Sequence, residues 1–129
     1  MTDYLTTEDL LTLVSDLRVG PVRDVGLLES AARRPATTLW GTPAYASLEE
    51  QAGALIESLV RGQPLVDGNK RLGWLALVVF LGLNGVELNA PDDDAYDLVI
   101  AIATGSADVA ATAAALRSWR EHPHRIRQD

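Results

Sequence analysis

The feature that most constrains this chain is an uninterrupted apolar stretch from Leu72 to Leu83 that has no polar face. The pair Asn84-Gly85 follows it, which is typical of the end of a helix. A helix that crosses a bilayer needs about 20 apolar residues, so this segment is too short to span a membrane. A helix that is apolar nearly all round is normally buried at the centre of a bundle. The stretch therefore predicts an all-α protein packed around this helix.

Helical signals dominate the rest of the chain, which contains no internal repeat and no convincing run of strands. Capping residues, acidic first turns and apolar residues spaced by three and four predict a compact bundle of about six helices around the buried one. The other predicted helices start at Thr7, span Val25–Arg34, run from Ser47 to about Gly62, start at Pro91 and end at Thr104, and run from Ala107 to about Glu121. Two prolines and a glycine in Pro35–Ala46 predict a loop or short hairpin there.

Length and charge bound the functional classes. With 129 residues, the chain predicts one domain over residues 1–129, whose polar tail at 120–129 is expected to fray. A net charge of −7 disfavours binding to nucleic acid, because a phosphate backbone repels an acidic protein. The absence of cysteine excludes disulfides and thiolate metal sites. Without a positively charged start before an apolar run, the N-terminus does not resemble a secretion signal, and we expect a cytoplasmic protein.

The segment at residues 63–71, QPLVDGNKR, carries the side chains most suited to chemistry. It leads into the start of the apolar helix, where unpaired backbone N–H groups form a ready site for a phosphate. Gly68 lets a ligand approach the backbone closely. Lys70 and Arg71 supply cationic donors for phosphate oxygens, and Asp67 is a hard oxygen ligand suited to Mg²⁺. The segment therefore predicts a site for a nucleoside triphosphate with its metal.

A purely structural interpretation of the same segment stands beside this one. Asn69 can simply cap the helix, Asp67 can pair with Arg71, and Lys70 can lie over the apolar helix. Lys70 is the only lysine of the chain, which favours a specific role for its charge. The spacing is not that of a Walker A loop.

The segment resembles the signature of the Fic/Doc family, which begins with His and continues through an acidic residue, a small residue and Asn. The Doc branch then has Lys-Arg, as at Lys70-Arg71, whereas the Fic branch has Gly-Arg and a second arginine three residues later, where Trp74 stands here. The chain therefore resembles the Doc branch, over about residues 5–120. Other segments similar to Doc-like chains are Val25–Glu29, the Ala-rich helix before the motif, the stretch from Phe80 to Gly85, and Ala103–Gly105.

The resemblance implies a compact all-helical toxin of a toxin–antitoxin pair. Such a toxin transfers phosphate from ATP, or another nucleoside triphosphate with Mg²⁺, to a threonine of elongation factor Tu and so halts translation. The implied partners are a cognate antitoxin and the protein target, without nucleic acid or membrane. Fic relatives transfer the nucleotide monophosphate instead, and a Fic-type nucleotidyl transferase is the alternative within the enzymes.

The resemblance also implies roles for the motif residues. Asp67 would hold Mg²⁺, and Gly68 and Asn69 would cradle phosphate through the start of the helix. Lys70 and Arg71 would neutralise the charge that builds on the transferring group, the largest catalytic contribution in phosphoryl transfer.

Gln63 departs from the family pattern, because it stands where the family has the histidine that removes the proton from the attacking hydroxyl. A carboxamide can orient a hydroxyl but cannot accept its proton. Three explanations for Gln63 stand side by side. The substitution is deliberate and made so that a toxic protein can be expressed, or it is natural and marks a nucleotide-binding or antitoxin-binding protein without catalysis. In the third explanation, another base such as His122 or His124 replaces the histidine.

Two features outside the motif are candidates for further contacts. Arg61 matches an arginine near the site in Doc-like chains and would add a phosphate contact, or it is a surface arginine at a helix end. The loop from Arg33 to Ser47 stands where the family presents a flap that aligns the target. Trp40 and Tyr45 would contact the target there, or both pack inward.

Overall fold

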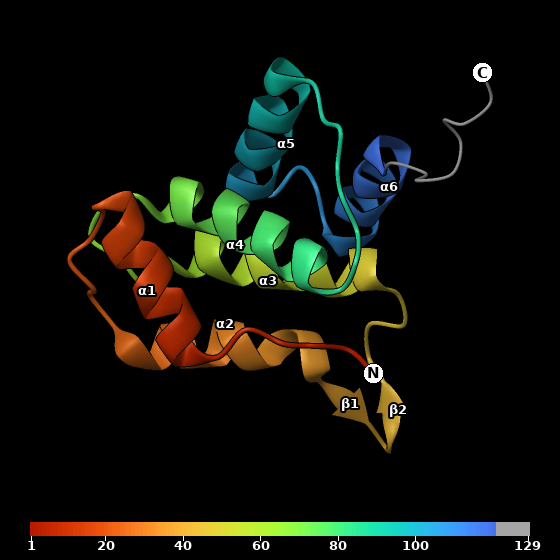
Figure 1. Ribbon diagram of the computed structural model, residues 1–129, viewed down its shortest axis with the longest axis horizontal. Coiled ribbons are helices and arrows are strands. Elements are labelled where there is room, and N and C mark those ends of the chain that lie inside the picture. Colours follow the sequence, from red (N-terminus) through yellow and green to blue (C-terminus); the bar gives the residue numbers. More distant parts are fainter. Residues whose placement is uncertain (121–129) are drawn as a thin grey trace.

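The computed structural model describes residues 1–120 and is mostly helical, as predicted (Figure 1). Six α-helices are joined by short connectors, and one small hairpin interrupts them between the second and third helices. The elements are α1 (Thr7–Leu17), α2 (Val25–Arg33), the 3-10 turn η1 (Arg34–Ala36), β1 (Thr38–Leu39), β2 (Thr42–Pro43), α3 (Leu48–Gly62), α4 (Asn69–Leu83), α5 (Asp92–Thr104) and α6 (Val109–Trp119).

Local contacts explain where most of the helices start. Thr6 and Ser47 each head a capping box, in which the hydroxyl accepts from the third residue of the helix and that residue's carboxylate accepts from the cap. Asp24 caps α2 and Asp108 caps α6 in the simpler way, with one side-chain acceptor each. Because Asp108 is the cap, α6 begins at Val109 and not at Ala107 as the sequence suggested.

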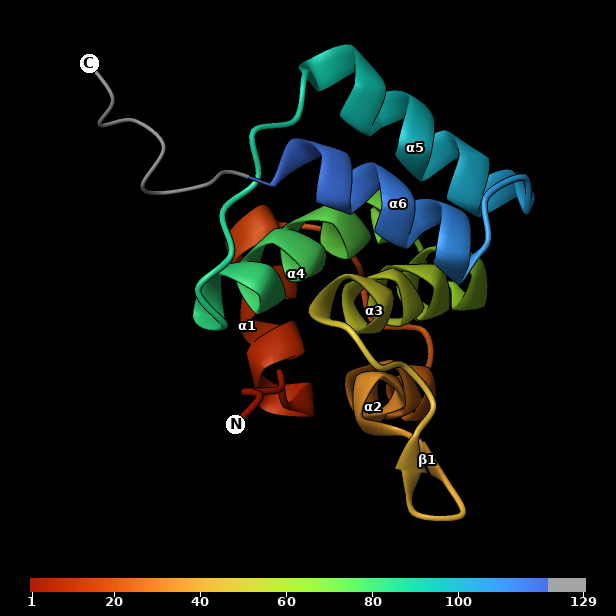
Figure 2. The same cartoon turned by 90° about the vertical axis from the view of Figure 1, so that its right-hand side faces the viewer.

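The centre of the bundle differs from the prediction. The sequence pointed to the apolar helix, now α4, but α3 is the helix that packs against η1, α2, α4, α5 and α6 (Figure 2). α4 packs against α1, α3 and α5 and leaves Val78 and Leu83 exposed. The reason is that several of the residues that α3 buries are small or polar, and these residue types do not identify a core helix in a sequence. Its buried residues include Glu49, Gln51, Ala52, Gly53 and Ala54.

Two glycines set the close approach of other helices to α3. A Cβ at Gly73 of α4 would lie 2.7 Å from Val60 Cγ2, and one at Gly53 would lie 3.3 Å from the Val109 carbonyl oxygen of α6. Real Cβ atoms need more room, so these positions let the backbones approach. The position of α4 against α3 therefore depends on Gly73.

The end of the described chain is attached to the bundle. Arg120, which the sequence assigned to the fraying tail, donates from Nη1 to Glu49 Oε2 at 2.9 Å and forms an isolated bridge with Leu88. His122, His124, the expected end of the last helix at Glu121 and the rest of the tail lie outside the described residues. Among residues 1–120, no helix has the length and apolar character needed to cross a membrane.

Candidate functional site

The motif loop, residues 63–68, lies against the connector between α1 and α2, residues 18–24. The two segments run antiparallel and exchange backbone hydrogen bonds along their length. The donors and acceptors are Gly20 N to Asp67 O (3.0 Å), Val66 N to Pro21 O (2.9 Å), Arg23 N to Pro64 O (2.7 Å) and Asp24 N to Pro64 O (3.0 Å), with a bridge between Val22 and Leu65. This pairing satisfies backbone groups that an irregular loop would otherwise leave open.

The side chain of Asn69 belongs to the loop and not to the helix that it begins. Its Oδ1 accepts from Leu65 N and its Nδ2 donates to Leu65 O, each at 2.9 Å. Both hydrogen-bonding ends of the carboxamide are therefore used in closing the loop, and α4 has no side-chain cap. The helix cap of the structural interpretation is not formed. The backbone N–H of Asn69 and the second hydrogen of its Nδ2 are the donors that this residue retains for a phosphate.

Gly68 shapes the entry into α4. Its φ is +93°, a value that favours glycine, and a Cβ there would overlap with the side chain of Val19 in the neighbouring connector. The requirement for glycine is therefore partly conformational and partly a matter of packing against Val19.

The N-terminus of α4 has an unusual charge arrangement. Its first turn contains Lys70 and Arg71 and no acidic residue, whereas α1, α3 and α5 all place carboxylates in the first turn. The first amides of a helix point outward without partners, and the positive end of the helix dipole disfavours cations. Two cations on an uncapped helix start leave a concentration of positive charge that an anion would compensate.

A hollow of about 330 Å³ lies at this helix start and gathers six of the seven predicted site residues. It is lined by Val60, Gln63, Val66, Asp67, Gly68, Asn69, Lys70, Arg71 and Ala103. The lining residue Ala103 lies on α5, far away in the sequence, and no local signal could have predicted it. Val60 and Val66 were also missed, because they carry no chemistry of their own.

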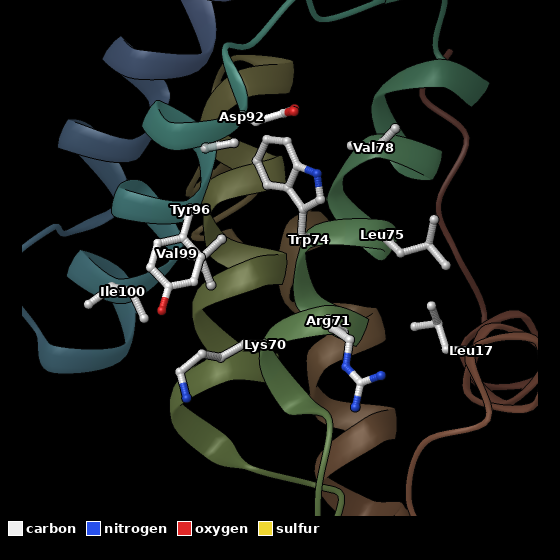
Figure 3. Close-up of a pocket in the computed structure, with 11 residues that line it drawn as sticks. Leu17, Lys70, Arg71, Trp74, Leu75, Val78, Asp92, Tyr96, Val99 and Ile100 are labelled. Carbon is white, nitrogen blue, oxygen red and sulfur yellow. The ribbon is translucent and has the colours of Figure 1, made fainter.

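The charged groups of the hollow do not neutralise one another. Among residues 1–120, the ion pairs involve Arg34, Arg117 and Arg120, so the pair between Asp67 and Arg71 in the structural interpretation is absent from the described part of the chain. Lys70 and Arg71 extend to opposite sides of the first turn of α4, as Figure 3 shows. Both still border the hollow beside Asp67.

Gln63 is the C-cap of α3 and has a left-handed backbone, with φ 56° and ψ 60°. Its side chain is exposed and lines the hollow. A left-handed conformation costs a non-glycine residue about 1–2 kcal/mol, so the surrounding contacts must hold it. Any side chain at this position projects from the end of α3 toward the start of α4.

The structure places Arg61 apart from the other candidate residues. It lines a second hollow between α2 and α3, and its guanidinium lies against Gly105 at the end of α5. Arg61 does not border the hollow of Lys70 and Arg71 in this conformation.

Asp67 is the one carboxylate that lines the hollow. Among the described residues, no group of three His, Asp or Glu side chains is arranged to hold a metal ion by protein ligands alone. Mg²⁺ commonly binds through one or two carboxylates together with substrate phosphates and water. A single carboxylate beside two cations fits a metal that arrives with a triphosphate.

An apolar groove of about 530 Å³ adjoins the hollow at the start of α4 and extends along this helix. Lys70 and Arg71 border both, and Trp74 points from α4 toward α5 in the groove (Figure 3). The remaining lining comes from α1, α4 and α5: Leu17, Leu75, Val78, Asp92, Ala95, Tyr96, Val99 and Ile100. Trp74 therefore faces the groove, and the position where the Fic pattern has its second arginine carries no cation here.

The hairpin lies at the other end of α3 from the motif (Figure 1). The 15 residues of α3 separate the two by about 22 Å of helix. Trp40 is fully exposed at the hairpin turn, whereas Tyr45 is half-buried and accepts a hydrogen bond from Arg34 Nε at 3.1 Å. Burial alone would lower the pKa of Arg34, but its ion pair with Glu57 and its bond to Tyr45 raise that pKa. The loop expected to form a flap beside the site is thus an exposed hairpin at the far end of α3 (Figure 1).

Comparison with known proteins relates the whole arrangement to one family. Residues 4–81 match the Fic/DOC family, a range that includes the complete motif loop and most of α4. The chain is also 47% identical over 123 residues to Toxin Doc of Mycolicibacterium smegmatis (strain ATCC 700084 / mc(2)155), an alignment that covers 92% of this chain and 95% of the relative.

Proposed function

The chain belongs to the Fic/DOC family, and we propose that it is a Doc-like toxin that binds a nucleoside triphosphate with Mg²⁺ and is built to transfer phosphate to a hydroxyl of a protein target. The observation that carries this proposal is the uncapped start of α4, where Lys70 and Arg71 border a hollow that also contains Asp67. A threonine of elongation factor Tu is the target that the family resemblance suggests.

Each motif residue has a distinct task in the proposed reaction. The first amides of α4 and the cations of Lys70 and Arg71 bind the phosphates and offset the negative charge of the transition state. Asp67 would hold the metal, which would add to that electrostatic stabilisation. Gly68 and Asn69 fix the shape of the loop, so that these groups border the same hollow.

Gln63 limits the reaction, because its carboxamide can hold the attacking hydroxyl but cannot take the proton. Loss of a positioned general base typically costs about 10²–10⁴-fold in rate. We therefore propose a site that binds its nucleotide and turns over slowly or not at all as the sequence stands.

The decisive experiment compares the chain with its Gln63→His variant, using ATP labelled at the γ or the α position and elongation factor Tu as substrate. We expect label from the γ position on the target, at least about 10²-fold faster in Gln63→His, together with growth arrest. The double variant Gln63→His with Lys70→Ala is the matched control and should lose this gain. Nucleotide binding without transfer in Gln63→His would instead support a binding module.

A Fic-type nucleotidyl transferase is the second candidate within the enzymes. Two observations weigh against it: Lys70 follows the Doc pattern, and Trp74 stands in the apolar groove where that branch has its second arginine. Transfer of label from the α position in the same experiment would reverse this assignment.

The apolar groove supports the proposed antitoxin as a partner. We propose that the apolar face of an antitoxin helix packs along α4 and α5, because such faces dock into apolar grooves of this kind. The substitution Val78→Lys places a charge in the groove and should abolish co-purification with the cognate antitoxin. Leu83→Lys is the control, since Leu83 is exposed on the same helix but does not line the groove. Equal binding by both variants would place the antitoxin elsewhere.

A further inference from the structure

The connector between α1 and α2 contacts the end of α3 through one side chain, that of Arg23. Arg23 Nε donates to the Gln63 carbonyl oxygen at 3.0 Å, and Nη2 donates to the same oxygen and to the Gly62 carbonyl oxygen at 3.2 Å. The backbone N–H of Arg23 donates to the Pro64 carbonyl oxygen at 2.7 Å. One residue of the connector thus bonds to three successive residues where α3 becomes the motif loop.

These contacts suit an arginine at the end of a helix. The last carbonyl groups of a helix have no partners within it, and the negative end of the dipole attracts a cation. The planar guanidinium can serve two neighbouring carbonyls at once, which a lysine ammonium does with less directional control. In the described chain, the basic residue within the last turn of α3 is Arg61, whose guanidinium lies against Gly105 instead.

We propose that Arg23 is a positioning residue: its bonds to the carbonyls of Gly62 and Gln63 hold residue 63 in its left-handed conformation, so that the side chain at this position faces the reacting hydroxyl. A non-glycine residue at φ 56° persists only where its surroundings fix it. The carbonyl of residue 63 is oriented by ψ, and its bonds to Arg23 therefore restrict this dihedral. The catalytic consequence rests on the proposed phosphotransfer; the structural part does not.

Arg23 and Asn69 control different parts of the loop. Arg23 bonds to residues 62–64, whereas Asn69 closes the loop at Leu65, next to the phosphate-binding start of α4. Loss of the Arg23 side chain should therefore disturb residue 63 more than the phosphates. This separation distinguishes a positioning role from a general contribution to folding.

The structural part is tested by hydrogen exchange on the full chain as it stands. In Arg23→Ala, the amide of Gln63, which donates to the Leu59 carbonyl oxygen at 3.3 Å, should exchange about tenfold faster than in the parent, the loss expected for hydrogen bonds to a charged group. The amide of Leu65, which is bonded to Asn69, should keep its protection. Arg23→Lys should recover part of the protection. Arg33→Ala removes another exposed arginine and should leave these amides unchanged. Unchanged exchange at Gln63 in Arg23→Ala, or an equal increase at Leu65 and throughout α3 and α4, would overturn the proposal.

The catalytic part is tested in the Gln63→His background. Adding Arg23→Ala should lower kcat about tenfold while the KM for ATP stays within about twofold, and Arg23→Lys should restore part of kcat. A rise in KM with unchanged kcat would overturn the positioning role. If Gln63→His itself transfers no phosphate, the proposed function has failed, and the exchange measurements alone decide whether Arg23 holds the loop.

Discussion

The carboxamide of Asn69 and the backbone of Leu65 form two reciprocal hydrogen bonds, each 2.9 Å long. They close the motif loop just before α4, so the loop's shape depends on a side chain from the helix that it precedes. This relationship explains why an asparagine stands at the helix start although α4 has no side-chain cap.

We expect Asn69→Ala to lower the free energy of unfolding by about 2 kcal/mol, because it leaves the Leu65 N–H and C=O without partners. Affinity for ATP-Mg²⁺ should fall as well, since the first amides of α4 lose their support. Urea unfolding and nucleotide titration check the two effects. Asn69→Asp keeps the acceptor and loses the donor, so it should be intermediate in stability. Full stability of Asn69→Ala would contradict the role given to this contact.

Gly68 provides a second test of the loop. Gly68→Ala should cost about 3 kcal/mol or more, because it combines a left-handed backbone with an overlap on Val19. Gly41→Ala is a close control: its φ is +81° but the space around it is open, so it should cost only about 1–2 kcal/mol. Urea unfolding of both, and of Gly68→Ala combined with Val19→Ala, separates strain from overlap. Equal costs for the two glycines would show that Val19 does not matter.

Lys70 should reveal a conflict between stability and binding. Lys70→Ala removes a cation from the positive end of α4 and should raise the free energy of unfolding by about 0.5 kcal/mol without ligand. The same change should weaken binding of ATP-Mg²⁺ about tenfold. Arg33→Ala removes a cation from the last turn of α2, where the dipole favours it, so stability should fall slightly and binding stay constant. Urea unfolding measures the free energy of unfolding of both variants, and titration with ATP-Mg²⁺ measures their affinity. Any other pattern of the two quantities would contradict this prediction.

Trp40 is expected to be dispensable for folding. It combines a left-handed φ of 54° with complete exposure, and its indole stabilises nothing in the described chain by burial. Asn tolerates this conformation better, so Trp40→Asn should raise the free energy of unfolding by about 0.5–1 kcal/mol. Trp74→Asn, within the groove, should instead destabilise the protein. A large loss of stability in Trp40→Asn, measured by urea unfolding, would show that the hairpin turn needs the indole.

The capping box of α3 predicts a specific effect of acid. Hydrogen bonds donated by the backbone N–H groups of Ser47 and Ala46 lower the pKa of the Glu50 carboxyl. The folded state therefore gains stability above the ordinary glutamate pKa of about 4.3, and this gain disappears as the pH falls through the lower folded value. The Tm difference between the parent and Glu50→Gln should thus shrink on acidification below roughly pH 4. Glu87→Gln, at an exposed position, provides the comparison.

Much of this molecule follows from interactions between neighbours in the chain. The starts of α1, α2 and α3 depend on side chains that bond to amides three residues away, so they could be predicted from the sequence alone. The start of α6 depends on the same kind of cap, at Asp108, and the sequence suggested a start two residues too early. Residues 63–71 likewise supply seven of the residues that line the hollow, which is why the position of the hollow could be predicted from one short segment.

Other features depend on packing between distant segments. Hydropathy pointed to α4 as the centre, but burial depends on which helices surround a segment, and α3 occupies that place with glycine, alanine and a buried glutamate paired to Arg120. Four other features depend on packing in the same way. They are the direction of the Arg61 side chain, the distance of the hairpin from the motif, the position of Ala103 at the hollow, and the hydrogen bonds from Arg23 to the Gln63 carbonyl oxygen. Hydrogen bonds between residues that are close in the sequence can be predicted from the sequence. The contacts between distant segments form only once the helices have packed together and their side chains have filled the space between them.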